Sequence, residues 1–422
     1  MKQFKELVLL WGVLCFFNAC TSSRDVVFEK IYSLIEQENF FKAKEFYDSN
    51  RNDFLQIHQN FIEAVLYNAF NQSEESENKI DFLIENKKSI PDSLIIKLYA
   101  LKKDNSLKLF NYKEAKNVVS VILNDYKEYL TEAQFKDYEN DLKLYTALEN
   151  TPPQKVVIRK NSIIKTTKDM AGLTTLKVFI ASDSLDFIFD TGANLSTTSM
   201  SIAEHFKMQI ITGNIDVGTA TSQKVIAQLA VCKKLTFGHI DVYNAVFLVL
   251  PNEFLYFPKD GYQIFGILGF PIIQALKEIH ISQDNKFIVP KKETTFTGQS
   301  NFAMDGLMPM IYIDGKNFRF DTGADFTVLY QKYYLENQKE IEQKYQLQKF
   351  SFAGAGGKEE YEGFIINPTF KVSGKDITLK NVNLLKNKIY HDESYYGNIG
   401  QDLIRQFDTM ILNFDQMFIK FE

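Results

Sequence analysis

Hydrophobic residues recur at helical spacing through the first third of the chain. Two stretches, residues 27–35 and 61–70, place their apolar side chains on one face of an expected helix. Thr131 followed by Gln134 fits a capping box, which signals the start of a helix. We therefore expect residues 24–150 to form a helical domain.

Two segments of this domain, residues 39–44 and 110–116, are similar to degenerate tetratricopeptide repeats, in which short helices stack as hairpins. The polar turn at residues 71–73 fits the connection inside such a hairpin. A plain helical bundle explains the pattern as well, so both arrangements remain open. A helical domain of either kind could bind a protein partner.

The pattern changes at residues 151–155, where Thr-Pro-Pro-Gln-Lys interrupts the helical spacing. Beyond this point β-branched and aromatic runs alternate with Gly, Asn and Asp turns, which favours strands over helices. The chain has 422 residues, more than one compact domain usually contains. We expect a multidomain protein of the α plus all-β class, helical first and β-rich afterwards.

The β-rich part contains the same signals twice at a fixed offset. Ile-Phe-Asp-Thr-Gly-Ala at 188–193 recurs as Arg-Phe-Asp-Thr-Gly-Ala at 319–324, and 321 − 190 is 131. Gly-Ile-Leu-Gly, ending at Gly269, recurs as Gly-Asn-Ile-Gly, ending at Gly400, and 400 − 269 is again 131. One Asp-Thr-Gly would arise easily by chance. Two of them, each followed by a second glycine motif at the same distance, indicate a duplicated lobe.

These motifs resemble those of the retropepsin-like and pepsin-like aspartic peptidases, in the form found in exported bacterial proteins. The resemblance covers roughly residues 170–422. It implies two duplicated retropepsin-like β-barrel lobes in one chain, which we place at residues 156–295 and 296–422. It also implies that Asp190 and Asp321 are the catalytic residues.

The resemblance gives supporting roles to the residues beside the two carboxyl groups, which are Thr191, Gly192, Thr322 and Gly323. The threonines would brace the two catalytic loops against each other, and the glycines allow a sharp turn and leave room beside the carboxylates. The second copy departs from the first in two places: Asn398 replaces Ile267, and Gln401-Asp402 replaces Phe270-Pro271. We expect neither change to touch the carboxylates.

A pair of carboxyl groups about 3 Å apart can hydrolyse an amide without a metal or a Ser or Cys nucleophile, because two like charges so close share one proton. The ionised member takes a proton from water, and the protonated member donates to the carbonyl oxygen and later to the leaving nitrogen. We expect an endopeptidase without a cofactor, whose site forms in a monomer and takes a peptide or protein substrate. The alternative for each Asp is a structural turn residue before Gly.

Glycine-rich segments at residues 213–219 and 352–357 fall where hairpin flaps would cover a bound peptide. The flap candidates are Gly218, Gly354 and Gly356. Mobile surface loops would have the same composition, so that interpretation also remains open.

The first twenty residues are typical of an export signal. A basic start precedes a short apolar run at residues 7–17, and Ala19 stands before Cys20. This arrangement is similar to a bacterial lipoprotein signal at residues 1–20, which implies that Cys20 carries a lipid anchor to a cell-envelope membrane. A cleaved secretory signal or an uncleaved anchor fits as well. All three place the remaining chain outside the cytoplasm, on a periplasmic or surface face.

Composition argues against several other functions. The formal net charge is −5 without a basic stripe, so we expect no nucleic-acid partner. The five histidines lack the spacing of metal ligands, so we expect no metal site. Cys232 has no partner outside the signal, and we expect a small buried residue.

Two rival functions remain. The bilobed cleft could hold a peptide or partner protein without cleaving it, or the helical domain could be a scaffold with the β-rich part as an accessory. Intact Asp190 and Asp321 favour catalysis, because a binder has no need of two buried carboxylates.

Overall fold

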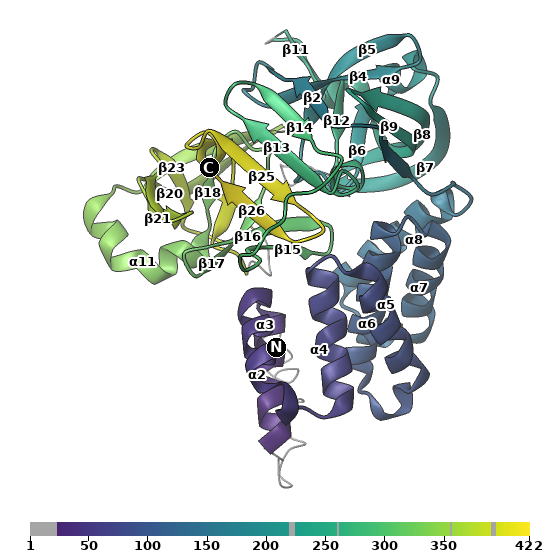
Figure 1. The fold of residues 1–422 in the computed structure, drawn as a ribbon, viewed down its shortest axis with the longest axis vertical. Coiled ribbons are helices and arrows are strands. Elements are labelled where there is room, and N and C mark those ends of the chain that lie inside the picture. Colours follow the sequence, from purple (N-terminus) through teal and green to yellow (C-terminus); the bar gives the residue numbers. More distant parts are fainter. Residues whose placement is uncertain (1–22, 219–223, 260, 355–356, 390–393) are drawn as a thin grey trace, which may run out of the picture.

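The computed structural model describes residues 23–422 except 219–223, 260, 355–356 and 390–393. Helices fill the first part of the chain and strands dominate the remainder (Figure 1). The expected order, a helical region followed by a β-rich region, is therefore confirmed.

The expected signal at residues 1–20, with Cys20, lies outside the described residues, so the lipoprotein interpretation stays a prediction. Among the residues that the structure does describe, no helix has the length and apolar character needed to span a bilayer.

The helical region is a series of helices joined by short turns. Its helices are α2 (Ser23–Glu36), α3 (Phe40–Asn50), α4 (Gln56–Ala69), α5 (Ser73–Glu85), α6 (Asp92–Lys108), α7 (Tyr112–Asp125) and α8 (Glu132–Leu148). The predicted capping box is present at α8: the Gln134 amide donates to Thr131 Oγ1 at 3.2 Å, and the Thr131 amide donates to Gln134 Oε1 at 3.0 Å.

Three turns of this region repeat one geometry. In each turn, the second residue after the preceding helix takes a left-handed conformation. The next amide donates to the carbonyl five residues back, which is a Schellman-type helix end. The left-handed residues are Glu38, Asn71 and Phe110. Each following helix buries a small residue on its first turn, namely Ala43, Ser76 and Ala115. The region is thus built from similar helical hairpins, and a tetratricopeptide-like nature remains a proposal.

The β-rich region contains two large sheets. The first runs in the order β1 (Lys155–Ile158), β9 (Ile240–Leu250), β6 (Ser196–Ser199), β12 (Gly266–Leu268), β5 (Asp183–Phe189), β4 (Thr174–Ile180), β8 (Lys224–Phe237) and β7 (Gln209–Gly218), with β3 (Thr167–Lys168) beside β4. The second runs in the order β15 (Phe302–Asp305), β16 (Met308–Ile313), β17 (Lys316–Phe320), β24 (Gly397–Ile399), β18 (Val328–Leu329), β23 (Val382–Leu385), β20 (Gly357–Ile366) and β19 (Gln348–Gly354).

Short elements complete this region. Two small hairpins pair β10 (Tyr256–Phe257) with β11 (Tyr262–Gln263) and β21 (Thr369–Val372) with β22 (Lys375–Thr378). The helices are α9 (Met200–His205), α10 (Phe270–Gln274), α11 (Gln331–Lys344) and α12 (Gln401–Ile404). Both α10 and α12 begin directly after a glycine of the repeated second motif.

A third sheet joins the two halves of the β-rich region. It runs in the order β2 (Ser162–Lys165), β14 (Lys286–Val289), β13 (Glu278–Ser282), β25 (Thr409–Asn413) and β26 (Phe418–Phe421). The antiparallel pairing of β13 with β25 is centred on His280 and Ile411, and 411 − 280 is 131. This pairing is therefore centred on two residues that are separated by the same offset as the sequence motifs.

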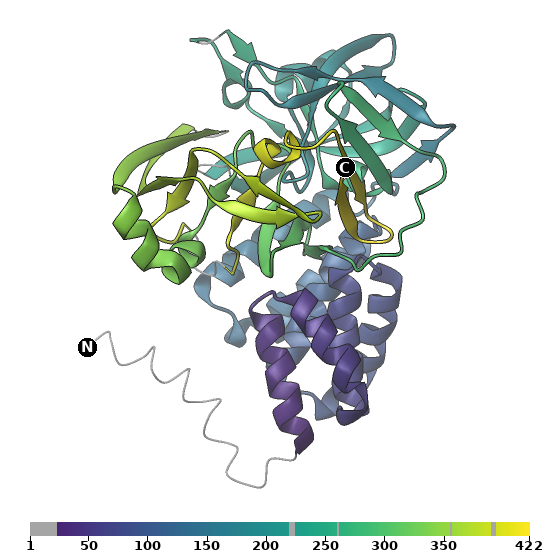
Figure 2. The same cartoon turned by 60° about the vertical axis from the view of Figure 1, so that its left-hand side comes forward.

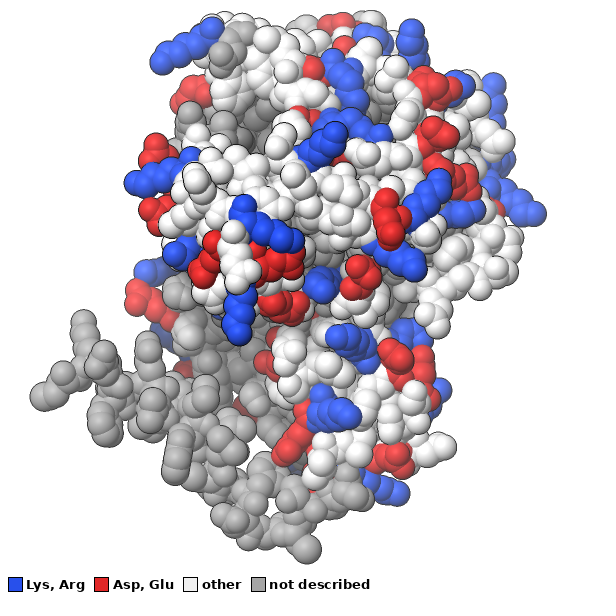
Figure 3. All heavy atoms as spheres, turned by 90° about the vertical axis from the view of Figure 1, so that its left-hand side faces the viewer, with Lys and Arg blue, Asp and Glu red and all other residues white. Residues whose placement is uncertain are grey.

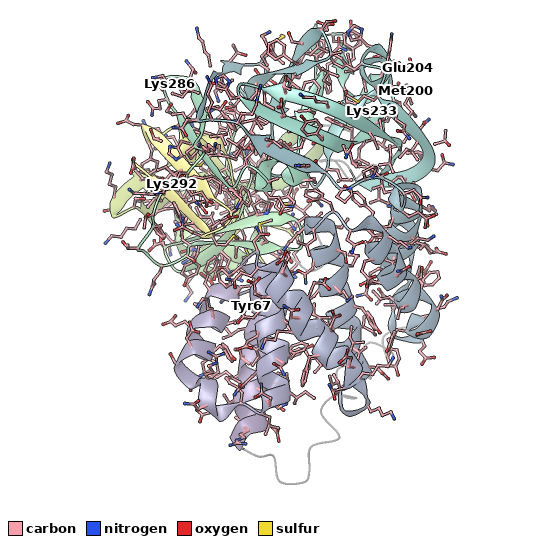
Figure 4. All side chains as sticks on the ribbon, turned by 45° about the vertical axis from the view of Figure 1, so that its right-hand side comes forward. Tyr67, Met200, Glu204, Lys233, Lys286 and Lys292 are labelled. Atoms are coloured by element: carbon pink, nitrogen blue, oxygen red, sulfur yellow. The ribbon has the colours of Figure 1, made fainter. Side chains whose placement is uncertain are left out.

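The turns of the helical region face the strands. Asn71 Nδ2 donates to the carbonyl of Phe414 at 3.1 Å, and Asn317 Nδ2 donates to the carbonyl of Glu38 at 3.1 Å. Figure 2 shows these helices beneath the strands, and Figure 4 shows Tyr67 at the end of α4 nearest to them. The helical region therefore packs directly on the β-rich region.

Charges are mixed on the surface. On the face drawn in Figure 3, Lys and Arg side chains alternate with Asp and Glu, and uncharged areas separate them. The expected lack of a nucleic-acid partner stays a prediction.

Candidate active site

The two Asp-Thr-Gly turns begin where buried strands end. Phe189 closes β5 and Phe320 closes β17, and both side chains are completely buried. Asp190 and Asp321 follow directly, and their amides donate to the carbonyls of Leu268 at 3.1 Å and of Ile399 at 3.0 Å. Buried aromatic residues therefore fix the base of each turn, and backbone hydrogen bonds fix its direction.

The strand pairs that carry these turns repeat at the offset of the sequence motifs. In the parallel pair of β5 and β12, Phe189 lies opposite Leu268. In the parallel pair of β17 and β24, Phe320 lies opposite Ile399. The two turns thus occupy equivalent places in the two large sheets.

Each turn orients its own carboxylate in the same way. The Gly192 amide donates to Asp190 Oδ1 at 2.8 Å, and the Gly323 amide donates to Asp321 Oδ1 at 2.8 Å. These bonds leave the second oxygen of each carboxylate for other partners.

The structure brings the two predicted catalytic residues together. A Cβ atom placed on Gly192 would lie 2.7 Å from Asp321 Cγ, and one on Gly323 would lie 2.3 Å from Asp190 Cγ. Both distances are too short for real carbon atoms, so each turn needs a glycine to admit the opposite carboxylate. The supporting role expected of these glycines in catalysis stays a prediction.

The two threonines join the turns to each other. Thr191 Oγ1 donates to the Phe320 carbonyl at 3.0 Å and accepts from the Thr322 amide at 3.0 Å. Thr322 Oγ1 donates to the Phe189 carbonyl at 2.9 Å and accepts from the Thr191 amide at 3.0 Å. Both side chains are 1% exposed, so these four bonds are shielded from water. They hold the carboxylates at a fixed separation.

Electrostatics within the pair favour one bound proton. Burial raises the pKa of Asp190 well above its usual value, and the charge of Asp321 and a hydrogen bond to it raise that pKa further. The amides of Gly192 and Ala193 oppose this shift. Two carboxyl groups that share a proton can act as an acid and a base at the same time.

The expectation that neither change in the second copy touches the carboxylates is wrong for Asn398. Its side-chain amide donates to Asp321 Oδ2 at 3.2 Å, so this substitution for Ile267 does touch a carboxylate. Gln401 also contacts the second turn, because its side-chain amide donates to the Thr322 carbonyl at 2.7 Å. The sequence held a signal for this contact, since a polar residue replaces an apolar one. Only the register of β24 beside β17 shows that the Asn398 side chain reaches Asp321.

The flap candidates lie on two long hairpins. Gly218 ends β7 and pairs with Lys224 of β8, and Gly354 ends β19 and pairs with Gly357 of β20. Gly356 lies outside the described residues. Residues 213–218 continue β7 after a register irregularity between Ile211 and Ile215, so they form one strand of the β7–β8 hairpin. That this hairpin is a flap stays a prediction.

Other chemical groups behave as ordinary structural residues. Cys232 is buried, and burial raises its pKa to about 11, which makes a reactive thiolate unfavourable. In the part of the chain that the structure describes, no group of three or more His, Cys, Asp or Glu residues is placed to hold a metal ion.

Comparison with known proteins points to one family. Residues 176–272 match the family model described as aspartyl protease. The match includes the Asp190 turn and Gly269, and the Asp321 turn lies outside it. This stretch of the chain is therefore aspartyl protease-like. No curated protein matches the sequence significantly.

Two solved structures are similar to parts of this chain. Basic 7S globulin from soybean has 10% sequence identity and a TM-score of 0.39, and the alignment covers 62% of this chain and 94% of that one. A retropepsin-like aspartic protease from Rickettsia conorii has 17% identity and a TM-score of 0.22, with 32% and 91% covered. Because both TM-scores are below 0.5, neither likeness bears on the function of this chain.

Proposed function

We propose that the protein is an aspartic endopeptidase with one catalytic pair, Asp190 and Asp321, formed by two duplicated lobes of a single chain. The observation that carries this proposal is the cross-bracing of the two turns by Thr191 and Thr322. A structural turn Asp needs no such brace between distant turns. The aspartyl protease-like match of residues 176–272 supports the same function.

The proposed reaction uses one water molecule and one shared proton. The ionised carboxylate takes a proton from water while the water oxygen bonds to the scissile carbonyl carbon. At the same time the protonated carboxyl donates its proton to the carbonyl oxygen. When the C–N bond breaks, a proton passes to the leaving nitrogen and the pair regains its single proton. Burial of the pair strengthens each of these interactions.

The proposed substrate is an extended peptide held between the lobes. Strand-like pairing with the hairpins of β7 with β8 and of β19 with β20 would hold its backbone and cover it. Since both turns come from one chain, the catalytic unit would be a monomer.

Peptide cleavage tests the proposal. The wild type should cleave components of a diverse peptide mixture, and a statine-type inhibitor should block the cleavage. Asp190→Asn and Asp321→Asn should each lower kcat by about 10²- to 10⁴-fold, because each removes an acid or base. Asp186→Asn, at a partly exposed position of β5, is the matched control and should retain activity. Absence of cleavage at any pH from acid to neutral would rule out the proposal.

A non-catalytic binder with the same cleft is the second candidate, and the duplicated turns fit it equally in shape. Peptide binding by the wild type without turnover, unchanged in the two Asn variants, would favour it.

We also propose that residues 1–20 are a lipoprotein signal and that Cys20 carries the membrane anchor. Mass spectrometry of the N-terminal fragment should find a lipid on Cys20, and Cys20→Ala should release the protein from membranes.

A further inference from the structure

The surroundings of the two carboxylates depart from local twofold symmetry at one position of the repeated second motif. In the first copy Ile267 lies opposite Ile188, and in the second copy Asn398 lies opposite Arg319. Both Ile267 and Asn398 are partly exposed. Of the two, only Asn398 brings a polar side chain to the pair.

This difference affects a single oxygen atom. Asp190 Oδ1 and Asp321 Oδ1 each accept an amide bond of 2.8 Å from their own turn. Asp321 Oδ2 also accepts from Asn398 Nδ2 at 3.2 Å. The equivalent position beside Asp190 is occupied by an isoleucine, which has no donor.

A donated hydrogen bond stabilises a carboxylate more than a neutral carboxyl group, because the charged oxygen is the stronger acceptor. We propose that Asn398 is a positioning residue that assigns the two roles in the pair, holding Asp321 as the carboxylate and leaving the proton on Asp190. This inference rests on the proposed function for its mechanistic meaning, but the position of the proton can be measured without any substrate.

The charged side chains near the second turn have partners other than the two carboxylates of the pair. Asp325 follows the second turn, and its Oδ1 accepts from Arg405 Nη1 at 2.6 Å, so the two charges compensate each other. Lys168 reaches the same side of the site but donates to Gln401 Oε1. The raised pKa of Asp190, caused first by burial and then by Asp321, agrees with a proton on Asp190.

The assignment defines each proton transfer. Asp321 takes the proton of the attacking water, and Asp190 gives its proton to the carbonyl oxygen, which yields a neutral tetrahedral diol. As the C–N bond breaks, the Asp321 proton passes to the leaving nitrogen, and a diol hydroxyl returns its proton to Asp190. The products are a carboxylic acid and an amine, and the pair ends in its starting state.

Carboxyl ¹³C NMR of protein labelled at aspartate tests the proposal directly. In the wild type the carboxyl that ionises at the lower pH should be Asp321, with the signals of the pair identified from Asp190→Asn and Asp321→Asn. In Asn398→Leu, which keeps the side-chain volume and removes the donor, the lower pKa should rise by about one unit. Asn383→Leu, a partly exposed asparagine of β23, is the matched control and should leave it unchanged.

A second variant covers the case in which Asn398→Leu does not fold. Ile267→Asn places a donor beside Asp190 and should make the two carboxyls titrate more alike. The proposal is overturned if Asp190 ionises first, which is the result expected if the Asn398 side chain turned its amide oxygen towards Asp321. It is also overturned if the folded variants leave both pKa values of the pair unchanged. Since the titration needs no substrate, a wild type that cleaves nothing would contradict the proposed function and still decide the role of Asn398.

Discussion

Single atoms decide whether the two turns can face each other. Gly323 stands against the carboxylate of Asp190, and a methyl group there has no space. Thr191 and Thr322 tie the two turns to each other, so the turn at Gly323 cannot move away from Asp190 without losing buried hydrogen bonds.

Gly323→Ala should therefore destabilise the fold by about 1–3 kcal/mol, as overpacking does, and should remove activity. Gly218→Ala is the control for stability, since its added Cβ meets nothing within 4 Å. Urea unfolding measures the stability of both variants. If Gly323→Ala unfolds like the wild type, the close approach of the turns is wrong.

The buried proton has a consequence for stability. The pKa of Asp190 is raised in the folded state. Above pH 3.8, the usual pKa of an aspartate, the unfolded chain therefore releases a proton that the folded protein keeps. The favourable contribution of this proton is complete below that value and is lost as the pH rises towards the raised pKa.

Asp190→Asn removes this titration and should raise the melting temperature relative to wild type, by more at neutral pH than at pH 4. Melting curves from acid to neutral pH test the trend, and Asp186→Asn should follow the wild type. A wild-type advantage that grows with pH would contradict the raised pKa.

At the scale of elements, α8 of the helical region holds β7, one strand of a proposed flap. Asn140 Nδ2 donates to the Asp216 carbonyl at 2.8 Å, and Asn140 Oδ1 accepts the Asp216 amide at 2.7 Å. A side chain that pairs with both backbone groups acts as a short extra strand along β7.

Asn140→Ala should lower the free energy of unfolding by about 1–2 kcal/mol, the value of two hydrogen bonds, and should speed hydrogen exchange at the Asp216 amide. Glu139→Ala, on the exposed side of α8, should change neither. Unchanged exchange at Asp216 in Asn140→Ala would show that α8 does not hold the strand.

Elements with a strong local signal could be predicted from the sequence, and pairings between distant segments could not. Helical spacing and the Thr131 capping box predicted helices, and the offset of 131 residues predicted two related aspartyl turns. The sheet that joins β13 to β25 has no local signal, because each strand alone is only a short apolar run. The contact of Asn398 with Asp321 was missed for the same reason, since it depends on the register of β24.

At the scale of the whole molecule, a polar cavity of about 570 Å³ lies between the helical region and the second large sheet, and Glu38 and Asp305 line it. Burial, followed by the charge of Asp305, raises the pKa of Glu38 to about 7. The proton on Glu38 thus stabilises the folded protein fully below pH 4.5, the usual pKa of a glutamate. This contribution is lost as the pH rises through about 7.

Glu38→Gln should flatten the fall in melting temperature across this range, because glutamine is neutral at every pH. Glu45→Gln, an exposed residue of α3, is the control. If Glu38→Gln and the wild type keep the same pH dependence, Glu38 does not titrate at this interface.

The most direct measurement of the central claim is a crystal structure with a bound statine-type peptide, whose hydroxyl takes the place of the attacking water. We expect that hydroxyl between the two carboxyl groups, within about 2.6–3.2 Å of an oxygen of Asp190 and of Asp321. A peptide bound elsewhere, or a hydroxyl that reaches one aspartate while the other faces a separate pocket, would contradict a shared catalytic pair.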